Sequence, residues 1–173
     1  DVPTTDGRRL FIGWMSNWQY ATVVPTERWR SAMTLPRELS LYATPAGPRL
    51  QSQPVRELHE WRTASHPVTD QPITLPRGIG EVVLQFDLAQ NQDGPLGFTL
   101  HNQRNETISL GYDPLENVFF VDRTQSGKQD FSPDFAGRHT AVRHSDQSQI
   151  RLHAYLDRAS VELFADDGQT VLT

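Results

Sequence analysis

The sequence predicts an all-β fold of short antiparallel strands, and three observations carry this prediction. Twelve prolines and eleven glycines are spread over 173 residues, so few windows are long enough for a helix. Apolar and polar residues alternate in many short runs, which is the period of a half-buried strand. Residues 165–168 read Ala-Asp-Asp-Gly between two such runs, a strong hairpin signal. Many short strands at regular spacing indicate a β-sandwich or another antiparallel architecture.

The expected strands can be placed in order along the chain. They cover residues 10–15, 31–42, 81–88, 97–101, 107–112, 117–122, 150–156, 160–164 and 169–172. Pro36 indicates an edge or a bulge within the second of them. Residues 51–62 have only Leu58 and Trp61 on a helical face, so a short helix is possible there. The predicted core comprises Val82, Leu84, Phe86, Phe98, Leu100, Phe119, Leu152, Val161 and Leu163.

The composition changes near residue 65. All four tryptophans precede it, and residues 65–72 combine Ser, His, Thr and Asp with two prolines, which is typical of a linker or an extended entry strand. We therefore divide the chain into residues 1–64 and residues 65–173, with the sandwich beginning near residue 70.

Charge and composition exclude several classes of partner and site. The net charge is -5 without a basic block, so we expect no nucleic-acid partner. No apolar run approaches the roughly 20 residues that span a bilayer, so we expect no membrane partner. The absence of cysteine excludes disulfides, thiolate metal sites and cysteine nucleophiles.

Histidine and carboxylate side chains give no convincing metal or acid/base pattern. The six histidines lack metal-ligand spacing, and the Asp166-Asp167-Gly168 segment lacks the ligands of a calcium loop, so a hairpin turn explains it. Glu27 and Glu38 bracket Trp29, but sequence alone cannot place two carboxylates across a sugar-sized gap. An ion pair between Arg37 and Glu38 is the simpler interpretation. We predict no metal site and no cofactor.

An aromatic cluster near the start of the chain is more informative. Trp14, Trp18 and Tyr20 lie within seven residues, beside the amides of Asn17 and Gln19. Aromatic faces stack on the C–H faces of sugar rings, and amides hydrogen-bond to their hydroxyls. A packed core cluster is an equally good interpretation of these residues.

Residues 13–21 (Gly-Trp-Met-Ser-Asn-Trp-Gln-Tyr-Ala) and 29–39 (Trp-Arg-Ser-Ala-Met-Thr-Leu-Pro-Arg-Glu-Leu) resemble glycoside hydrolase family 32. That family contains the levanases, exo-inulinases and invertases. The resemblance continues in order through residues 53–58, 126–135 and 157–168, so it covers nearly the whole chain.

The resemblance implies an architecture. Members of the family have an N-terminal five-bladed β-propeller that holds the active site, followed by a β-sandwich. Residues 1–64 are then expected to be a remnant of the last propeller blade and its connection, and residues 65–173 the C-terminal sandwich module with its final strands missing. Residue 1 is Asp without a signal segment, and residues 170–173 have the pattern of the middle of a strand, so the chain is expected to be cut at both ends. The missing propeller portion or a homo-oligomer is expected to cover the apolar side chains of the remnant.

The resemblance also implies where chemistry is absent. Family members use an Asp nucleophile in Asn-Asp-Pro-Asn, a stabilising Asp in Arg-Asp-Pro and a Glu acid/base in Glu-Cys. None of these motifs occurs here, and the Asp113-Pro114 dipeptide lacks the preceding Arg. We therefore expect no catalytic residue in this chain, and no hydrolysis by the chain alone.

Trp18 is the main substrate-binding residue that the resemblance implies, as an apolar wall of the fructose pocket. Asn17, Tyr20 and Trp14 are further candidates, and Trp14 can alternatively pack between propeller strands. The complete protein is then a retaining β-fructosidase acting on levan, inulin or sucrose without a cofactor, secreted or periplasmic in a bacterium. The alternatives are a non-catalytic sandwich module that binds fructan or has a structural role, or one chain of a split enzyme.

Overall fold

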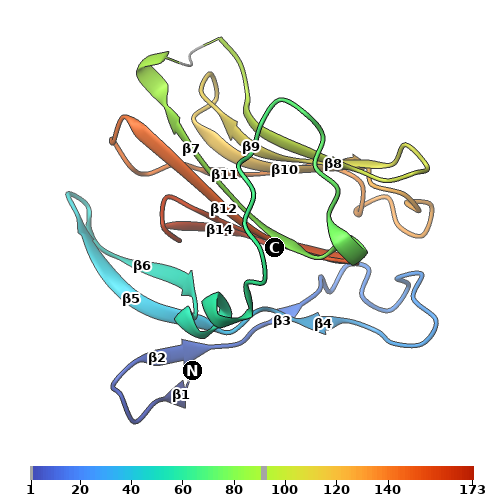
Figure 1. Ribbon diagram of the computed structural model, residues 1–173. Helices are drawn as coiled ribbons and strands as arrows, with labels where there is room; N and C mark the ends of the chain where they lie inside the picture. Colours follow the sequence, from blue (N-terminus) through green and yellow to red (C-terminus); the bar gives the residue numbers. More distant parts are fainter. Residues whose placement is uncertain (1, 91–92) are drawn as a thin grey trace.

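Antiparallel strands form almost all of the regular structure in the computed structural model, which describes residues 2–90 and 93–173 (Figure 1). The prediction of an all-β fold is confirmed. A first four-stranded sheet has the order β1-β2-β5-β6 and comprises β1 (Val2–Pro3), β2 (Arg9–Phe11), β5 (Arg37–Thr44) and β6 (Gly47–Pro54). A separate ladder pairs β3 (Trp14–Met15) with β4 (Ala32–Met33).

Two further four-stranded sheets form the sandwich. One has the order β11-β10-β9-β8 and comprises β8 (Leu96–His101), β9 (Thr107–Asp113), β10 (Val118–Gln125) and β11 (Arg138–Val142). The other has the order β14-β13-β12-β7 and comprises β7 (Gly80–Asp87), β12 (Gln149–Asp157), β13 (Ser160–Ala165) and β14 (Thr170–Leu172).

The sandwich core lies between these two sheets. Phe119, Leu152 and Leu163 are completely buried, as their positions on alternating strands predicted. The other six predicted core residues are partly buried and pack against the same cluster: Val82, Leu84, Phe86, Phe98, Leu100 and Val161. Alternation worked here because each strand turns one face to the opposite sheet and the other face outward.

The hairpin between β13 and β14 is also confirmed. Asp166 and Asp167 adopt positive φ angles of 45° and 56°, which Asp tolerates in tight turns. The Asp166 carboxylate has a second role, because it accepts a hydrogen bond from Nε of buried Arg143 at 2.6 Å. A turn therefore explains the backbone of this segment, and an internal ion pair explains one of its side chains.

Three predicted boundaries differ from the structure. The run 10–15 divides into β2 and β3, and the run 31–42 divides into β4 and β5 before Arg37. The possible helix at 51–62 is only a short 3-10 segment at Arg56–Trp61, because residues 51–54 continue β6. Two other 3-10 segments lie at Pro76–Gly78 and Leu88–Gln90. Strands β6 and β11 were missed because their residues, Gly-Pro-Arg-Leu-Gln-Ser-Gln-Pro and Arg-His-Thr-Ala-Val, lack a clear apolar alternation.

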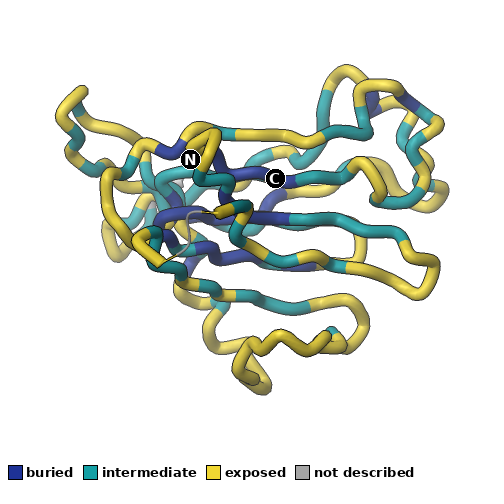
Figure 2. The backbone as a smooth tube through the Cα atoms, turned by 90° about the horizontal axis from the view of Figure 1, so that it is seen from above, coloured by how far each residue is buried: buried dark blue, intermediate teal, exposed yellow. Residues whose placement is uncertain are grey.

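Burial differs sharply between the two parts of the chain. Figure 2 shows the buried stretches concentrated in central strands, while connections and outer strands are exposed. In residues 2–64, large apolar side chains remain exposed at Ile12, Trp14, Trp18, Val23, Trp29, Met33, Leu41, Leu50 and Trp61. Phe11, Met15 and Leu35 are half-buried. Across the described residues, no helix has both the length and the apolar character needed to cross a membrane.

Candidate functional site

The turn that follows β3 carries three of the predicted sugar-binding residues, Asn17, Trp18 and Tyr20, and Asn17 shapes it. The Asn17 side-chain oxygen accepts a hydrogen bond from the backbone N–H of Gln19 at 2.9 Å. Its backbone carbonyl accepts from the N–H groups of Tyr20 at 3.2 Å and Ala21 at 2.8 Å. A side-chain oxygen bonded two residues ahead is the local turn that Asn favours. Asn17 therefore places the residue that follows it, Trp18, at the tip of a defined turn.

Trp14 of β3 and Trp18 of the turn form an exposed aromatic pair. Their ring centroids are 4.9 Å apart with an interplanar angle of 54°. Trp18 is 87% exposed and Trp14 is 40% exposed, while Met33 lies opposite Trp14 in the β3–β4 ladder. Solvent-accessible indole faces of this kind can stack on a sugar ring.

Tyr20 lies in a different environment, although it is only two residues from Trp18. It is 7% exposed, and its ring makes edge-on contacts with Phe131 and Phe135, at centroid distances of 6.2 Å and 5.6 Å. Nη2 of Arg123 donates a hydrogen bond to the Tyr20 hydroxyl at 2.8 Å. The structure thus brings Trp14 of β3 beside Trp18 on the Asn17 turn, and places Tyr20 in the contact with the sandwich.

A buried ion pair forms a second contact between the two parts of the chain. Arg37 of β5 donates from Nε to Oε2 of Glu162 in β13 at 3.2 Å, and from Nη2 to the same oxygen. The other Glu162 oxygen accepts from the backbone N–H of Leu35 at 2.6 Å. The predicted Arg37–Glu38 pair is therefore wrong, and Glu38 instead lies 3.7 Å from Arg8. Adjacent residues of a strand point to opposite faces, so they rarely pair with each other.

The β13–β14 hairpin makes the third contact, with β6. The Gly168 carbonyl accepts from the N–H of Ser52 at 2.9 Å, and the Asp167 carbonyl accepts from the side-chain amides of Gln51 and Gln53, each at 2.9 Å. A Cβ atom at Gly168 would lie 2.1 Å from the Ser52 carbonyl oxygen. This glycine therefore permits both the positive φ of the turn and the close approach of the two backbones.

The connection between the two parts is fixed by a carboxylate. Glu81 accepts two hydrogen bonds from Arg62, at 2.6 Å and 2.5 Å, and lies 2.6 Å from Nε2 of His153. Burial alone would raise the pKa of Glu81, but these partners lower it to about 2. Burial is also the main cause of the lowered pKa of His153. Ionised Glu81 can only accept, so the neutral histidine donates from Nε2.

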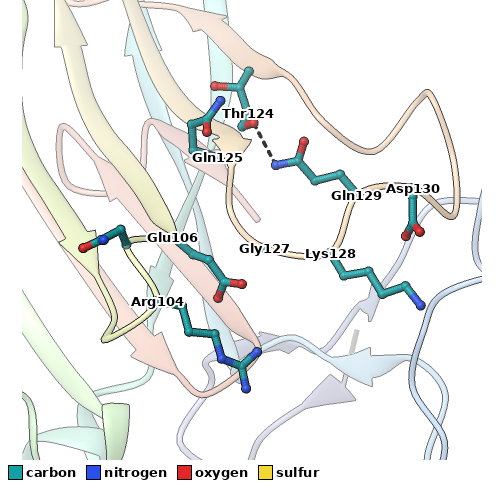
Figure 3. Close-up of a pocket in the computed structure, with 9 residues that line it drawn as sticks. Arg104, Glu106, Thr124, Gln125, Gly127, Lys128, Gln129 and Asp130 are labelled. Carbon is teal, nitrogen blue, oxygen red and sulfur yellow. Dashed lines mark hydrogen bonds between the residues drawn. The ribbon is translucent and has the colours of Figure 1, made fainter.

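A polar hollow of about 620 Å³ lies on the sandwich, where the β8–β9 turn faces the loop after β10 (Figure 3). Its lining residues are Arg104, Asn105, Glu106, Thr124, Gln125, Gly127, Lys128, Gln129 and Asp130. Gln129 donates to the Thr124 carbonyl at 2.7 Å, and the same loop continues into Phe131. None of the lining residues is aromatic, so the hollow lacks a surface on which a sugar ring can stack.

Within residues 2–90 and 93–173, no three histidine or carboxylate side chains come together as potential ligands. Sequence patterns contain no signal for Arg123 or Glu162, two of the sandwich residues that contact the N-terminal part, since both lie more than 100 residues from their partners.

Known proteins and family models match this chain over its whole length. The model of the glycosyl hydrolases family 32 C-terminal domain matches residues 51–173, and the model of that family's N-terminal domain matches residues 2–54. A levanase of Bacillus subtilis is 38% identical over 100% of this chain and 27% of its own length. An extracellular exo-inulinase of Aspergillus niger is 34% identical over 95% of this chain and 33% of its own length.

Solved structures agree with this match. The exo-inulinase of Aspergillus awamori superposes with a TM-score of 0.82 at 29% sequence identity, over 94% of this chain and 34% of the other. The sucrose-6-phosphate hydrolase of Lactobacillus gasseri has the same fold, with a TM-score of 0.76 at 20% identity over 98% of this chain and 34% of the other. This chain thus spans about a third or less of the length of these relatives.

Proposed function

Because this chain belongs to glycoside hydrolase family 32, we propose that it is the C-terminal part of a retaining β-fructosidase that releases terminal β-fructosyl units from levan, inulin or sucrose. The observation that carries the proposal is the exposed Trp18 ring on the Asn17 turn, within a chain that a levanase matches from end to end. The names levanase and exo-inulinase among the relatives support a fructan as substrate.

The reaction requires two carboxyl groups. One attacks the anomeric carbon of the fructosyl unit, the other protonates the leaving oxygen, and water then hydrolyses the covalent intermediate. We place both groups outside these 173 residues, because the family's three catalytic motifs do not occur in the sequence. Several carboxylates in the chain are instead held by arginines, namely Glu81, Asp166 and Glu162.

The turn residues then have distinct proposed roles. Trp18 forms an apolar wall against the fructosyl ring, and Trp14 supports it through the contact at 4.9 Å. Asn17 presents Trp18 by shaping the turn. A direct sugar contact for Tyr20 stays a prediction. This scheme uses no metal ion and no cofactor.

The two parts of the chain contribute differently to the proposed enzyme. Residues 1–64 supply strands of the last propeller blade and the connection, and residues 65–173 supply the sandwich. We propose that the remaining propeller, or a second copy of the chain, covers the exposed side chains of Ile12, Trp29 and Met33. Extracellular enzymes among the relatives support a secreted protein.

Activity assays test the proposal directly. The complete polypeptide that contains this chain, made in a host without invertase, should release fructose from sucrose, inulin or levan. The 173-residue chain alone should release none, since the groups that carry most of the rate are absent. Hydrolysis by the isolated chain would overturn the proposed location of the carboxylates. An inactive complete polypeptide that still binds fructan would favour a non-catalytic binding module.

The role of Trp18 needs a separate test. Trp18→Ala in the complete enzyme should lower kcat/KM by a factor corresponding to roughly 1–3 kcal/mol, if the ring is a stacking wall. Leu41→Ala removes another exposed apolar side chain, on β5, and serves as the control. Unchanged kinetics in Trp18→Ala would assign the ring to packing against the propeller.

A further inference from the structure

We infer that Arg123 of the sandwich is a positioning residue for sugar recognition: it holds Tyr20, and through Tyr20 it holds the turn that presents Trp18. This inference rests on the proposed function of Trp18. The sandwich then contributes indirectly to substrate recognition, through an arginine that does not itself touch the sugar.

The first step is that Arg123 is itself held in place. Its backbone N–H donates to the carbonyl of Gly137 at 3.0 Å. Its carbonyl accepts from the N–H and the hydroxyl of Ser126, at 3.2 Å and 2.8 Å. The guanidinium lies over the Phe135 ring, 4.3 Å from its centroid, which is a favourable cation–π distance. The arginine therefore projects from a fixed strand end in a fixed direction.

The second step is that Tyr20 is held by Arg123 and its neighbours. The hydroxyl accepts the Arg123 hydrogen bond at 2.8 Å, and the ring is enclosed by Phe131 and Phe135, whose own centroids are 4.6 Å apart. A hydrogen bond to a charged donor is stronger than one between neutral groups, and burial strengthens it further. Tyr20 is thus the point at which the turn is fastened to the sandwich.

The third step connects Tyr20 to Trp18. The carbonyl of Asn17 accepts hydrogen bonds from the backbone N–H groups of both Tyr20 and Ala21, so residues 17–21 form one closed turn. Trp18 is part of this turn. Trp18 is 87% exposed, and its ring contact with Trp14 alone cannot fix the turn, because Trp14 is itself partly exposed. A side chain that must meet a sugar in one orientation loses affinity when its backbone is free to move. The buried Tyr20 end therefore limits that movement.

The kinetic test uses the complete enzyme with sucrose as the substrate. Arg123→Met and Tyr20→Phe each remove the hydrogen bond, and each should lower kcat/KM about tenfold. The double variant should lose little more than either single variant, because the two changes remove the same contact. Arg138→Met is the matched control: this sandwich arginine also lies over a ring, that of Phe120, but pairs with Asp113 and Glu116. It should leave kcat/KM unchanged.

A second arm separates positioning from general stability. In a Trp18→Ala background, Arg123→Met should have no further effect on kcat/KM, since its action passes through the missing ring. A full additional tenfold loss in that background would overturn the inference. If Trp18→Ala itself leaves the kinetics unchanged, the proposed role of Trp18 fails, and the sugar-recognition part of the inference fails with it.

A spectroscopic arm uses the 173-residue chain and needs no activity. With 5-fluorotryptophan incorporated, Tyr20→Phe should shift or broaden the fluorine signal of Trp18 while the signal of Trp61 stays in place. Arg123→Met also removes the hydrogen bond that Arg123 donates to His139 at 3.1 Å. Tyr20→Phe keeps the ring packing, so it is the variant to use if Arg123→Met folds poorly. An unmoved Trp18 signal would show that the turn does not depend on this contact, whatever the kinetics.

Discussion

The sandwich and the N-terminal strands differ in how they bury their apolar side chains. The sandwich closes a core between its own two sheets, with Leu110, Phe119, Ile150, Leu152 and Leu163 completely buried. The N-terminal strands bury few large side chains, and two residues that are buried there, Tyr20 and Arg37, are covered by sandwich residues.

This difference shows which region stabilises the other. They are joined by contacts of Tyr20 with Arg123, Arg37 with Glu162, Arg62 with Glu81, and Ser52 with Gly168. Three of these contacts use charged groups, whose orientation is more restricted than that of apolar packing. Because the sandwich has its own buried core, we expect it to fold without the N-terminal strands more readily than these strands fold without the sandwich.

The largest effect is expected at the buried ion pair. Glu162→Gln leaves the Arg37 guanidinium buried without a charged partner, which should lower the free energy of unfolding by about 3–5 kcal/mol in urea titrations. Arg151→Gln, which breaks the exposed pair with Asp167, should cost less than about 1 kcal/mol. Replacing Arg37 and Glu162 together by Met should recover much of the loss. Equal effects of the buried and exposed variants would contradict this account.

The next effect compares a leucine from each region. Leu152→Ala creates a cavity at a position that is 0% exposed, and should cost about 2–5 kcal/mol. Leu41→Ala in β5, at a position that is 71% exposed, should change stability by less than about 0.5 kcal/mol. Thermal or urea unfolding of both variants provides the measurement. A large loss at Leu41 would mean that a second chain covers this strand in solution.

A pair of glycines isolates the contact between the regions. Gly168 and Gly7 have nearly equal φ angles of +81° and +83°, so an added Cβ should cost about 1–2 kcal/mol of backbone strain at each. Only at Gly168 would that atom also clash, since the Ser52 carbonyl oxygen would be 2.1 Å away. Gly168→Ala should therefore be the more destabilising variant, by about 1 kcal/mol if the hydrogen bond to Ser52 is lost. Protease digestion should then cleave β6 sooner in Gly168→Ala than in Gly7→Ala.

The smallest effect is a dependence on pH at the connection. The pKa of His153 is lowered from its ordinary value of 6.5 by burial, so the unfolded chain binds its proton more readily than the folded chain. The contribution of His153 to the free energy of unfolding is complete above pH 6.5 and is lost as the pH falls below that value. Glu81, with its pKa lowered from 4.5 to about 2, contributes fully above pH 4.5 and loses its contribution toward pH 2.

Urea midpoints between pH 7 and pH 5 measure the histidine contribution. They should fall with pH in the parent chain, and the slope should flatten in His153→Gln. His101→Gln, which removes an exposed histidine, should leave the slope unchanged. A midpoint that rises on acidification between pH 6.5 and pH 5 would contradict the assigned direction.

Sequence patterns located every sandwich strand except β11, because apolar alternation is a local property of each strand. Val82, Leu84 and Phe86 alternate along one strand, so the face that they share was evident before any partner was known. The Asp-Asp-Gly segment specified its own turn for the same reason. The strand β11 was missed because it lacks this alternation, and pairing with β10 gives it its place in the sheet.

The candidate site shows what local sequence patterns cannot predict. Trp14, Trp18 and Tyr20 belong to one chemical class within seven residues, and the residues alone identified them as a cluster that could equally bind a sugar or pack in a core. Only the folded chain separates them, with Trp18 open to solvent and Tyr20 enclosed by Arg123 and two phenylalanines. Arg37 likewise meets Glu162 rather than its neighbour Glu38. Local periodicity tells which side chains share a face; tertiary packing chooses which surface, more than 100 residues away, covers that face.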